Sequence, residues 1–175
     1  MTFPPSWMLC PRTSPMPSDA KTLEHQRLDL DRFLPYRLSV LSNRVSSEIA
    51  RHYSDRFGLT IPEWRVMAVL GQTPNLSARE VAARTAMDKV QVSRAVAALV
   101  EARRVQRRDD AGDGRITRLS LTAKGHAIYD EIVPLALNLE SVFLSALTGE
   151  ERETLDRLMR KLSERVGSLI TRPLE

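Results

Sequence analysis

Several residue types are scarce in this sequence, and each scarcity narrows what the protein can be. Cysteine occurs once in 175 residues, at Cys10, so no disulfide can form within one chain. No apolar run approaches the roughly 18 residues of a membrane-spanning helix. The first residues also lack the charged and apolar segments of a secretory signal. We therefore expect a cytoplasmic protein with no membrane contact.

Catalytic and metal-binding motifs are missing as well. The sequence contains no GxSxG, P-loop, GxGxxG or HExxH pattern. Its three histidines, His25, His52 and His126, do not have the spacing of metal ligands. Hydrophobic residues make up 42% of the chain and charged residues 27%, which is ordinary for a globular protein. These observations predict a globular protein that is not an enzyme and needs no cofactor or metal ion.

Proline is distributed unevenly along the chain. Five of the ten prolines lie within residues 1–19, which predicts a disordered, Pro-rich tail over residues 1–22. Apolar residues then recur every three or four positions, which predicts one long helix from about Leu28 to Phe57. Pro35 falls in its first turns, and Gly58 fits the position of a C-cap.

Three shorter helices should follow, each with a signal at its amino terminus. In each, a Thr, Ser or Asp precedes a Glu or Gln by three positions, which is the spacing of a capping box. The pairs are Thr60 with Glu63, Ser77 with Glu80, and Asp88 with Gln91. We expect helices of about 12, 8 and 16 residues, the first of them closed by Gly71 and Pro74.

A change of pattern after Val105 predicts a β-hairpin, because two extended runs flank a turn-rich centre from Asp109 to Gly114. Two long helices should end the chain. Thr122 can cap the first, and Thr148 with Glu151 forms a capping box for the second. Their apolar stripes are long for one small domain to bury alone.

The order of these elements predicts the fold class. The expected fold is mostly α-helical with a small β-hairpin wing. A winged helix-turn-helix should span residues 58–121, and long dimerisation helices should flank it at residues 23–57 and 122–172. In such a motif the second helix enters the major groove of DNA. On the helix after Asp88, one face should be buried: Val92, Ala95, Val96 and Leu99.

The opposite face of that helix is unusual for a surface in contact with water alone. It carries short side chains together with Gln91 and Arg94, which can make bidentate contacts to adenine and guanine. Residues 89–108 hold six Lys or Arg and one acid, Glu101, a local charge of +5 that exceeds the +4 of the whole chain. An amphipathic helix seen alone is more often a core helix with a solvated face. The neighbouring helix and hairpin favour DNA, although Arg103 and Arg104 suit a helix terminus as well as a phosphate.

Residues 28–170 resemble MarR-type regulators, the multiple antibiotic resistance regulator family. The strings that carry the resemblance are VSRAVAALVEARRVQRR, DGR at 113–115, and LSLTAKG. The resemblance implies that Arg115 extends from the wing toward the minor groove and that Asp113 holds it in place. It also implies DNA contacts from six further residues: Ser77, Arg79, Lys89, Gln91, Ser93 and Arg94. Two positions depart from the family pattern, with Arg104 where Gly is usual and Gly114 where Arg is common.

The same resemblance implies a homodimer, built from the long outer helices, and a small-molecule effector. Candidate effector-binding residues are Tyr36, Arg37, Trp64 and Met67. Because an Arg can pair with a carboxylate, an aromatic acid or its thioester is the expected effector class. Residues such as Trp64 and Met67 more often belong to a hydrophobic core, and one such as Arg37 is more often a salt-bridge or surface residue.

The function expected from the sequence is therefore a ligand-responsive repressor that binds double-stranded DNA at a pseudo-palindromic site. Two alternatives remain open. The same fold could serve an activator, or a helical module that contacts other proteins and has lost DNA binding. The second alternative draws its only support from the departures at Arg104 and Gly114.

Overall fold

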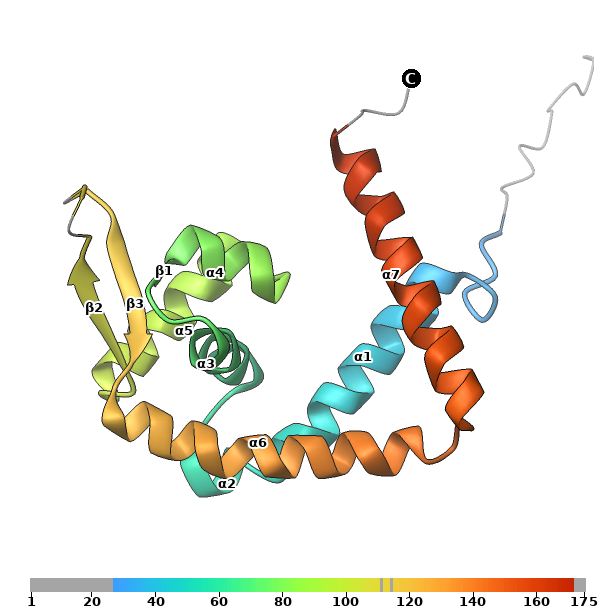
Figure 1. Ribbon diagram of the computed structural model, residues 1–175, viewed down its shortest axis with the longest axis horizontal. Coiled ribbons are helices and arrows are strands. Elements are labelled where there is room, and N and C mark those ends of the chain that lie inside the picture. The colour runs from blue at the N-terminus through green and yellow to red at the C-terminus, as the bar shows by residue number, and fades with distance from the viewer. Residues whose placement is uncertain (1–26, 111, 114, 172–175) are drawn as a thin grey trace, which may run out of the picture. The chain divides into compact units, whose positions relative to one another are not determined.

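The computed structural model describes residues 27–110, 112–113 and 115–171, and Figure 1 shows the order of the elements. This part of the chain is mostly helical and has one small antiparallel sheet, as the sequence predicts. The elements are α1 (Leu34–Arg51), α2 (Ser54–Phe57), α3 (Ile61–Gln72), β1 (Leu76–Ser77), α4 (Ala78–Thr85), α5 (Lys89–Glu101), β2 (Val105–Asp109), β3 (Thr117–Leu121), α6 (Ala123–Leu144) and α7 (Gly149–Thr171). The tail predicted over residues 1–22 lies outside the described residues.

The described residues up to Arg37 form a unit separate from those that follow. A turn at Asp29 precedes α1, where the Asp29 carboxylate accepts the Asp31 N–H at 3.1 Å. The Asp29 carbonyl accepts the Phe33 N–H at 3.0 Å. Most apolar side chains of this unit are exposed to solvent, among them Leu28, Leu30, Phe33, Leu34 and Tyr36.

The prediction of one continuous helix over residues 28–57 is wrong at its start and near its end. It begins only at Leu34, because Pro35 has no N–H to continue the ladder into a preceding turn. It also breaks after Arg51, where the Tyr53 N–H donates to the Ala50 carbonyl, a bond that tightens the last turn. Tyr53 is buried, with 1% of its surface exposed, so the break places a large aromatic ring in the core. Gly58 closes α2 in the left-handed conformation, as expected.

Helix α3 starts as predicted but ends differently. Thr60 and Glu63 form the expected capping box. Gly71 lies inside the helix instead of closing it, and α3 ends at Gln72. A Cβ at Gly71 would lie 2.4 Å from the ring of Tyr129 in α6. Glycine is therefore required here because the ring of Tyr129 packs against the helix backbone, and not because the helix ends at this position.

One hydrophobic core lies among α3, α4, α5, the sheet and the first half of α6. Its fully buried large side chains are Tyr53, Val66, Met67, Leu70, Val81, Val92, Leu99, Val105 and Ile132. The sheet has the order β1-β3-β2, and Leu119 of β3 is paired with Leu76 on one side and Arg107 on the other. The hairpin of β2 and β3 was predicted, whereas the two-residue strand β1 was not.

The end of α5 is joined to the start of α6 through the backbone of Arg104. Its carbonyl accepts the Thr122 N–H at 3.0 Å, and the Thr122 hydroxyl caps α6 by accepting the Gly125 N–H at 3.1 Å. A Cβ at Gly125 would lie 2.1 Å from the Arg104 carbonyl oxygen. Only glycine fits there, so Gly125 fixes how α6 leaves the hairpin.

Helices α6 and α7 carry apolar side chains that the rest of the chain leaves uncovered. In α6, Ile128 and Ile132 are buried, whereas Leu137, Val142 and Phe143 are exposed. In α7 the exposed residues are Leu155, Leu158, Met159, Leu162 and Val166. Among the described residues, no single helix is long and apolar enough to cross a membrane. The pair formed by α6 and α7 satisfies such a test only jointly, and it bends by 111° at its break.

Substitution of Gly125 tests the junction between α5 and α6. Gly125→Ala should lower the free energy of unfolding by about 1–3 kcal/mol, because the new methyl group overlaps a backbone carbonyl that cannot swing away. Urea denaturation measures the change. Gly149→Ala is the matched control, since its added Cβ meets nothing within 4 Å. Equal stability of the Gly125→Ala variant and the unmodified protein would contradict the account.

Candidate nucleic-acid interface

The amino terminus of α4 is fixed by a complete capping box. The Ser77 hydroxyl accepts the Glu80 N–H at 3.3 Å, and the Glu80 carboxylate accepts the Ser77 N–H at 2.8 Å. The hydroxyl of Ser77 also donates to that carboxylate at 2.7 Å. Ser77 is therefore occupied as a cap and is half-buried, while Arg79 is exposed in the first turn of α4.

Helix α5 begins at the expected cap, because the Asp88 carboxylate accepts the Gln91 N–H at 2.7 Å. Its predicted core face is confirmed, with Val92, Ala95, Val96 and Leu99 all buried. The side chains on the predicted outer face are exposed: Lys89, Val90, Gln91, Ser93, Arg94, Ala97 and Glu101.

The polar side chains of this outer face are free to bind a partner. Within the described residues, Lys89, Ser93 and Arg94 make no side-chain hydrogen bond or ion pair, and the side-chain amide of Gln91 makes none either. Gln91 and Arg94 also line an open hollow of about 380 Å³ between the start of α3 and α5. The other residues around it are Thr60, Pro62, Glu63, Ala95 and Ala98. Four of the predicted contact residues thus project together from one helix.

The carboxyl end of α5 is a Schellman motif, in which two N–H groups satisfy carbonyls of the last turn. The Arg103 N–H donates to the Val100 carbonyl at 2.9 Å, and the Arg104 N–H donates to the Leu99 carbonyl at 2.8 Å. Arg103 has φ of +58°, the left-handed conformation that favours glycine. The helix therefore ends three residues earlier than the 16 expected, at Glu101. The strained residue is Arg103 and not Arg104.

Arg104 has a structural position. Its side chain is half-buried and donates from Nη2 to the Phe57 carbonyl, which lies at the end of α2. Its Nε is buried and has no hydrogen-bond partner among the described residues. Arg104 stands where the family pattern has glycine, and its hydrogen bond with Phe57 links α2 to the end of α5. Arg103 remains exposed at the helix terminus, while Gly114 lies outside the described residues.

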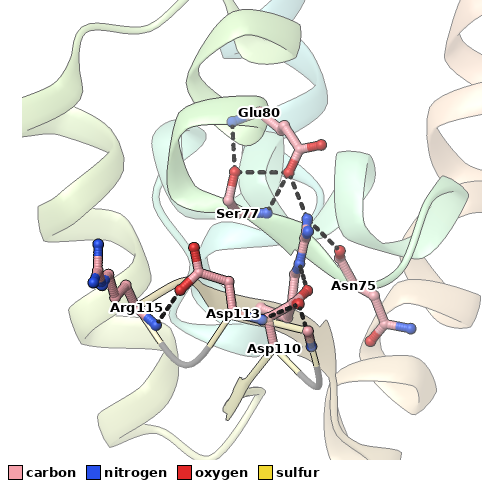
Figure 2. A network of polar contacts seen from close by, with 8 residues as sticks. Asn75, Ser77, Glu80, Asp110, Asp113 and Arg115 are labelled. Atoms are coloured by element: carbon pink, nitrogen blue, oxygen red, sulfur yellow. Dashed lines mark hydrogen bonds and ion pairs between the residues drawn. The ribbon is translucent and has the colours of Figure 1, made fainter.

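The wing contains an ordered set of polar contacts (Figure 2). The Asp110 carboxylate accepts the N–H groups of Gly112 at 2.9 Å and Asp113 at 3.1 Å. Asp113 in turn accepts the N–H of Arg115 at 3.0 Å, so it holds the backbone of Arg115 and leaves the guanidinium free. The side chain of Arg115 is exposed and points away from these contacts in Figure 2.

Arg118 is the residue of this region that the sequence analysis missed. Its Nε donates to Asp110 at 2.5 Å, and its Nη1 donates to Glu80 at 3.0 Å. The predicted hairpin contained a weak indication that Arg118 needs an acidic partner. In the hairpin register Arg118 lies directly opposite Arg108, and like charges in that position are unfavourable unless one has an acidic partner.

The carboxylates of this network stay ionised at neutral pH. The pKa of Asp110 is lowered chiefly by its hydrogen bond with Arg118, and that of Glu80 chiefly by its hydrogen bonds with Ser77. A carboxyl group with a lowered folded-state pKa stabilises the fold above its unfolded pKa and loses that contribution as the pH falls through the folded value. The contacts of the wing with α4 therefore weaken only in acid.

The four candidate effector-binding residues are divided between the two units of the chain. Tyr36 and Arg37 are exposed and belong to the separate amino-terminal unit. Met67 is fully buried in the core. Trp64 is half-buried, with its ring 5.7 Å from Tyr53 and 6.0 Å from Tyr129, measured between centroids.

The hydroxyl of Tyr53 is buried beside Trp64 and finds no hydrogen-bond partner in the part of the chain that the structure describes. Burial raises the pKa of Tyr53 to about 12. No group of three or more His, Cys, Asp or Glu side chains suited to a metal ion occurs among the described residues.

These features define a winged helix-turn-helix protein, with α4 and α5 as the helix-turn-helix and β2 and β3 as the wing. Residues 57–116 match the MarR family. The part of the chain that contains the winged helix-turn-helix is thus similar to this family of transcriptional regulators.

Individual relatives agree with this assignment. The HTH-type transcriptional repressor Rv2887 of Mycobacterium tuberculosis is 28% identical over 131 residues, which cover 74% of this chain and 91% of the relative. A MarR/EmrR family regulator from Acinetobacter sp. ADP1 is 26% identical, with a TM-score of 0.74 over 81% of this chain and 99% of its own. BpsR of Bordetella bronchiseptica has the same fold at 23% identity, with a TM-score of 0.68 over 79% and 98% of the two chains.

Replacement of Arg103 tests the strained end of α5. Arg103→Gly should raise the free energy of unfolding by about 1 kcal/mol, because glycine adopts positive φ without the clash of a Cβ. Arg103→Ala is the control, since it removes the side chain but keeps the Cβ. If thermal unfolding shows equal gains for both variants, the effect arises from lost charge repulsion and not from backbone strain.

Proposed function

We propose that this protein is a ligand-responsive repressor that binds a pseudo-palindromic operator as a homodimer. The exposed and unpaired polar face of α5 carries the proposal. In the bound state α5 lies in the major groove, where Gln91 and Arg94 contact base edges and Lys89 and Ser93 contact the flanks. Arg115 reaches the minor groove from the wing, and Arg79 meets a phosphate at the start of α4.

The positions of the charges support this arrangement. Lys89 and Arg94 on α5, and Arg107 and Arg108 on β2, are all exposed. Phosphate contacts need such side chains, since neutralising phosphates releases counterions and drives binding. The alternative of a protein-interaction module loses the support of Arg104, which serves the packing of α2 against the end of α5.

The uncovered apolar side chains of the long helices support the homodimer. They lie on α1, on the second half of α6 and on α7, outside the winged motif. We assign residues 23–57 and 122–172 to dimerisation and residues 58–121 to DNA binding. A two-fold dimer places two copies of α5 about one helical turn of DNA apart, so the operator should repeat in inverted order.

The aromatic cluster of Tyr53, Trp64 and Tyr129 supports a small aromatic effector. Trp64 lies on α3, whose start shares the hollow with Gln91 and Arg94, and Tyr129 lies on α6. An effector that binds this cluster better in one conformation than in another would shift the spacing of the two α5 helices. DNA binding by BpsR is regulated by 6-hydroxynicotinic acid, an aromatic acid. Repression is the proposed direction, because Rv2887 is a repressor.

The experiment that tests this function selects genomic fragments with the purified full-length protein and titrates the best fragment across a salt series. We expect one inverted repeat to be enriched, with an affinity that falls steeply as salt rises. Adding 6-hydroxynicotinic acid to the same titration tests the effector class. Weak binding without sequence preference at physiological salt would refute the proposal that the protein is a transcriptional regulator. Binding by a monomer would refute the proposal that the operator is an inverted repeat.

Replacement of Arg94 tests the role of α5. Arg94→Ala should weaken binding to the selected fragment by about 1–3 kcal/mol per contact and relax the preference at one base pair in each half-site. Arg94→Lys is the matched control, because it keeps the charge and removes the planar fork that a bidentate contact to a base needs. A uniform loss across all fragments would place Arg94 on a phosphate instead of a base.

A further inference from the structure

Arg118 differs from the other arginines of the wing because its guanidinium forms ion pairs with two carboxylates. Its guanidinium lies against two carboxylates, Asp110 and Glu80, and 29% of the side chain is exposed. Nη1 also lies 3.5 Å from the Asn75 carbonyl oxygen. By contrast Arg107 and Arg115 are exposed and make no side-chain hydrogen bond or ion pair among the described residues.

The two carboxylates belong to different parts of the winged motif. Glu80 is the N3 residue of the α4 capping box, and one of its oxygens, Oε2, accepts from both Ser77 and Arg118. Asp110 organises the turn of the wing through the N–H groups of Gly112 and Asp113. Arg118 thus joins the start of α4 to the turn that carries the wing.

The chain of contacts ends at a residue proposed to meet DNA. From the α4 cap it runs through Glu80, Arg118 and Asp110 to Asp113, which accepts the Arg115 N–H at 3.0 Å (Figure 2). A two-stranded ribbon alone would leave the direction of the wing turn weakly fixed. The network fixes it, because one guanidinium fork binds a carboxylate on each side.

We propose that Arg118 is a positioning residue for DNA binding: it anchors the wing to the start of α4, sets where Arg115 lies relative to α5, and does not itself contact DNA. This inference rests on the proposed function for its consequence at DNA. The anchoring itself is a property of the free protein. Loss of the anchor lowers the fraction of molecules whose wing is correctly placed, so the apparent dissociation constant rises by the inverse of that fraction.

The test uses the full chain with Arg118→Met, which keeps the aliphatic stem and removes the charge. Hydrogen exchange of the free protein measures whether the N–H groups of Gly112, Asp113 and Arg115 open more readily. Asp110→Asn serves as a second variant, because asparagine can still accept the turn N–H groups while the ion pair with Arg118 is lost. Arg107→Met is the matched control for the exchange measurement, since Arg107 lies on β2 of the wing and makes no side-chain hydrogen bond or ion pair among the described residues.

Binding to the fragment selected above gives the second measurement. Arg118→Met should weaken binding about tenfold, the effect expected if about a tenth of the molecules keep the productive wing. The slope of log affinity against log salt should stay unchanged, whereas Arg115→Met should reduce it by about one per bound protomer. The double variant Asp110→Asn with Arg118→Met should bind no worse than either single variant, since both remove one contact.

Two outcomes would overturn the proposal. Unchanged exchange at Gly112, Asp113 and Arg115 in Arg118→Met would show that this residue does not anchor the wing, whether or not the protein binds DNA. A reduced salt slope for Arg118→Met would show that the guanidinium contacts a phosphate directly. Faster exchange in a protein that selects no fragment would instead uphold the anchor and refute the proposed regulator.

Discussion

Burial of one face of α5 is the constraint on which the rest of this structure depends. Val92, Ala95, Val96 and Leu99 are removed from water against α3 and α4, and the hydrophobic effect fixes the rotation of the helix about its axis. With that rotation fixed, Lys89, Gln91, Ser93 and Arg94 must point outward. The surface that we propose reads DNA is thus a consequence of packing the core.

The ends of the neighbouring elements are fixed by local polar contacts, and these determine what surrounds α5. The caps at Ser77 and Asp88 set where α4 and α5 begin, and the left-handed Arg103 sets where α5 ends. Arg104 and Thr122 then connect α5 to α2 and α6. The proposed recognition surface is consequently fixed at both ends, and contacts at its carboxyl end connect it to α2 and α6.

Local signals in the sequence were sufficient for much of this fold. Capping pairs such as Thr60 with Glu63 depend on neighbours three residues apart, and the buried face of α5 follows from helical periodicity. The features that escaped prediction depend on distant partners. The break before Tyr53 reflects a core that only the folded chain contains, Gly71 accommodates a ring from α6, and Arg118 pairs with residues 8 and 38 positions away.

The most direct test of the central claim is methylation interference on the selected DNA duplex. Methylating guanine N7 adds a group in the major groove, where α5 is proposed to lie. The account predicts two groups of guanines, about one helical turn apart, whose methylation blocks binding. Binding that tolerates every N7 methyl group but is blocked by methylation of adenine N3 in the minor groove would contradict it, because the wing alone would then read the DNA.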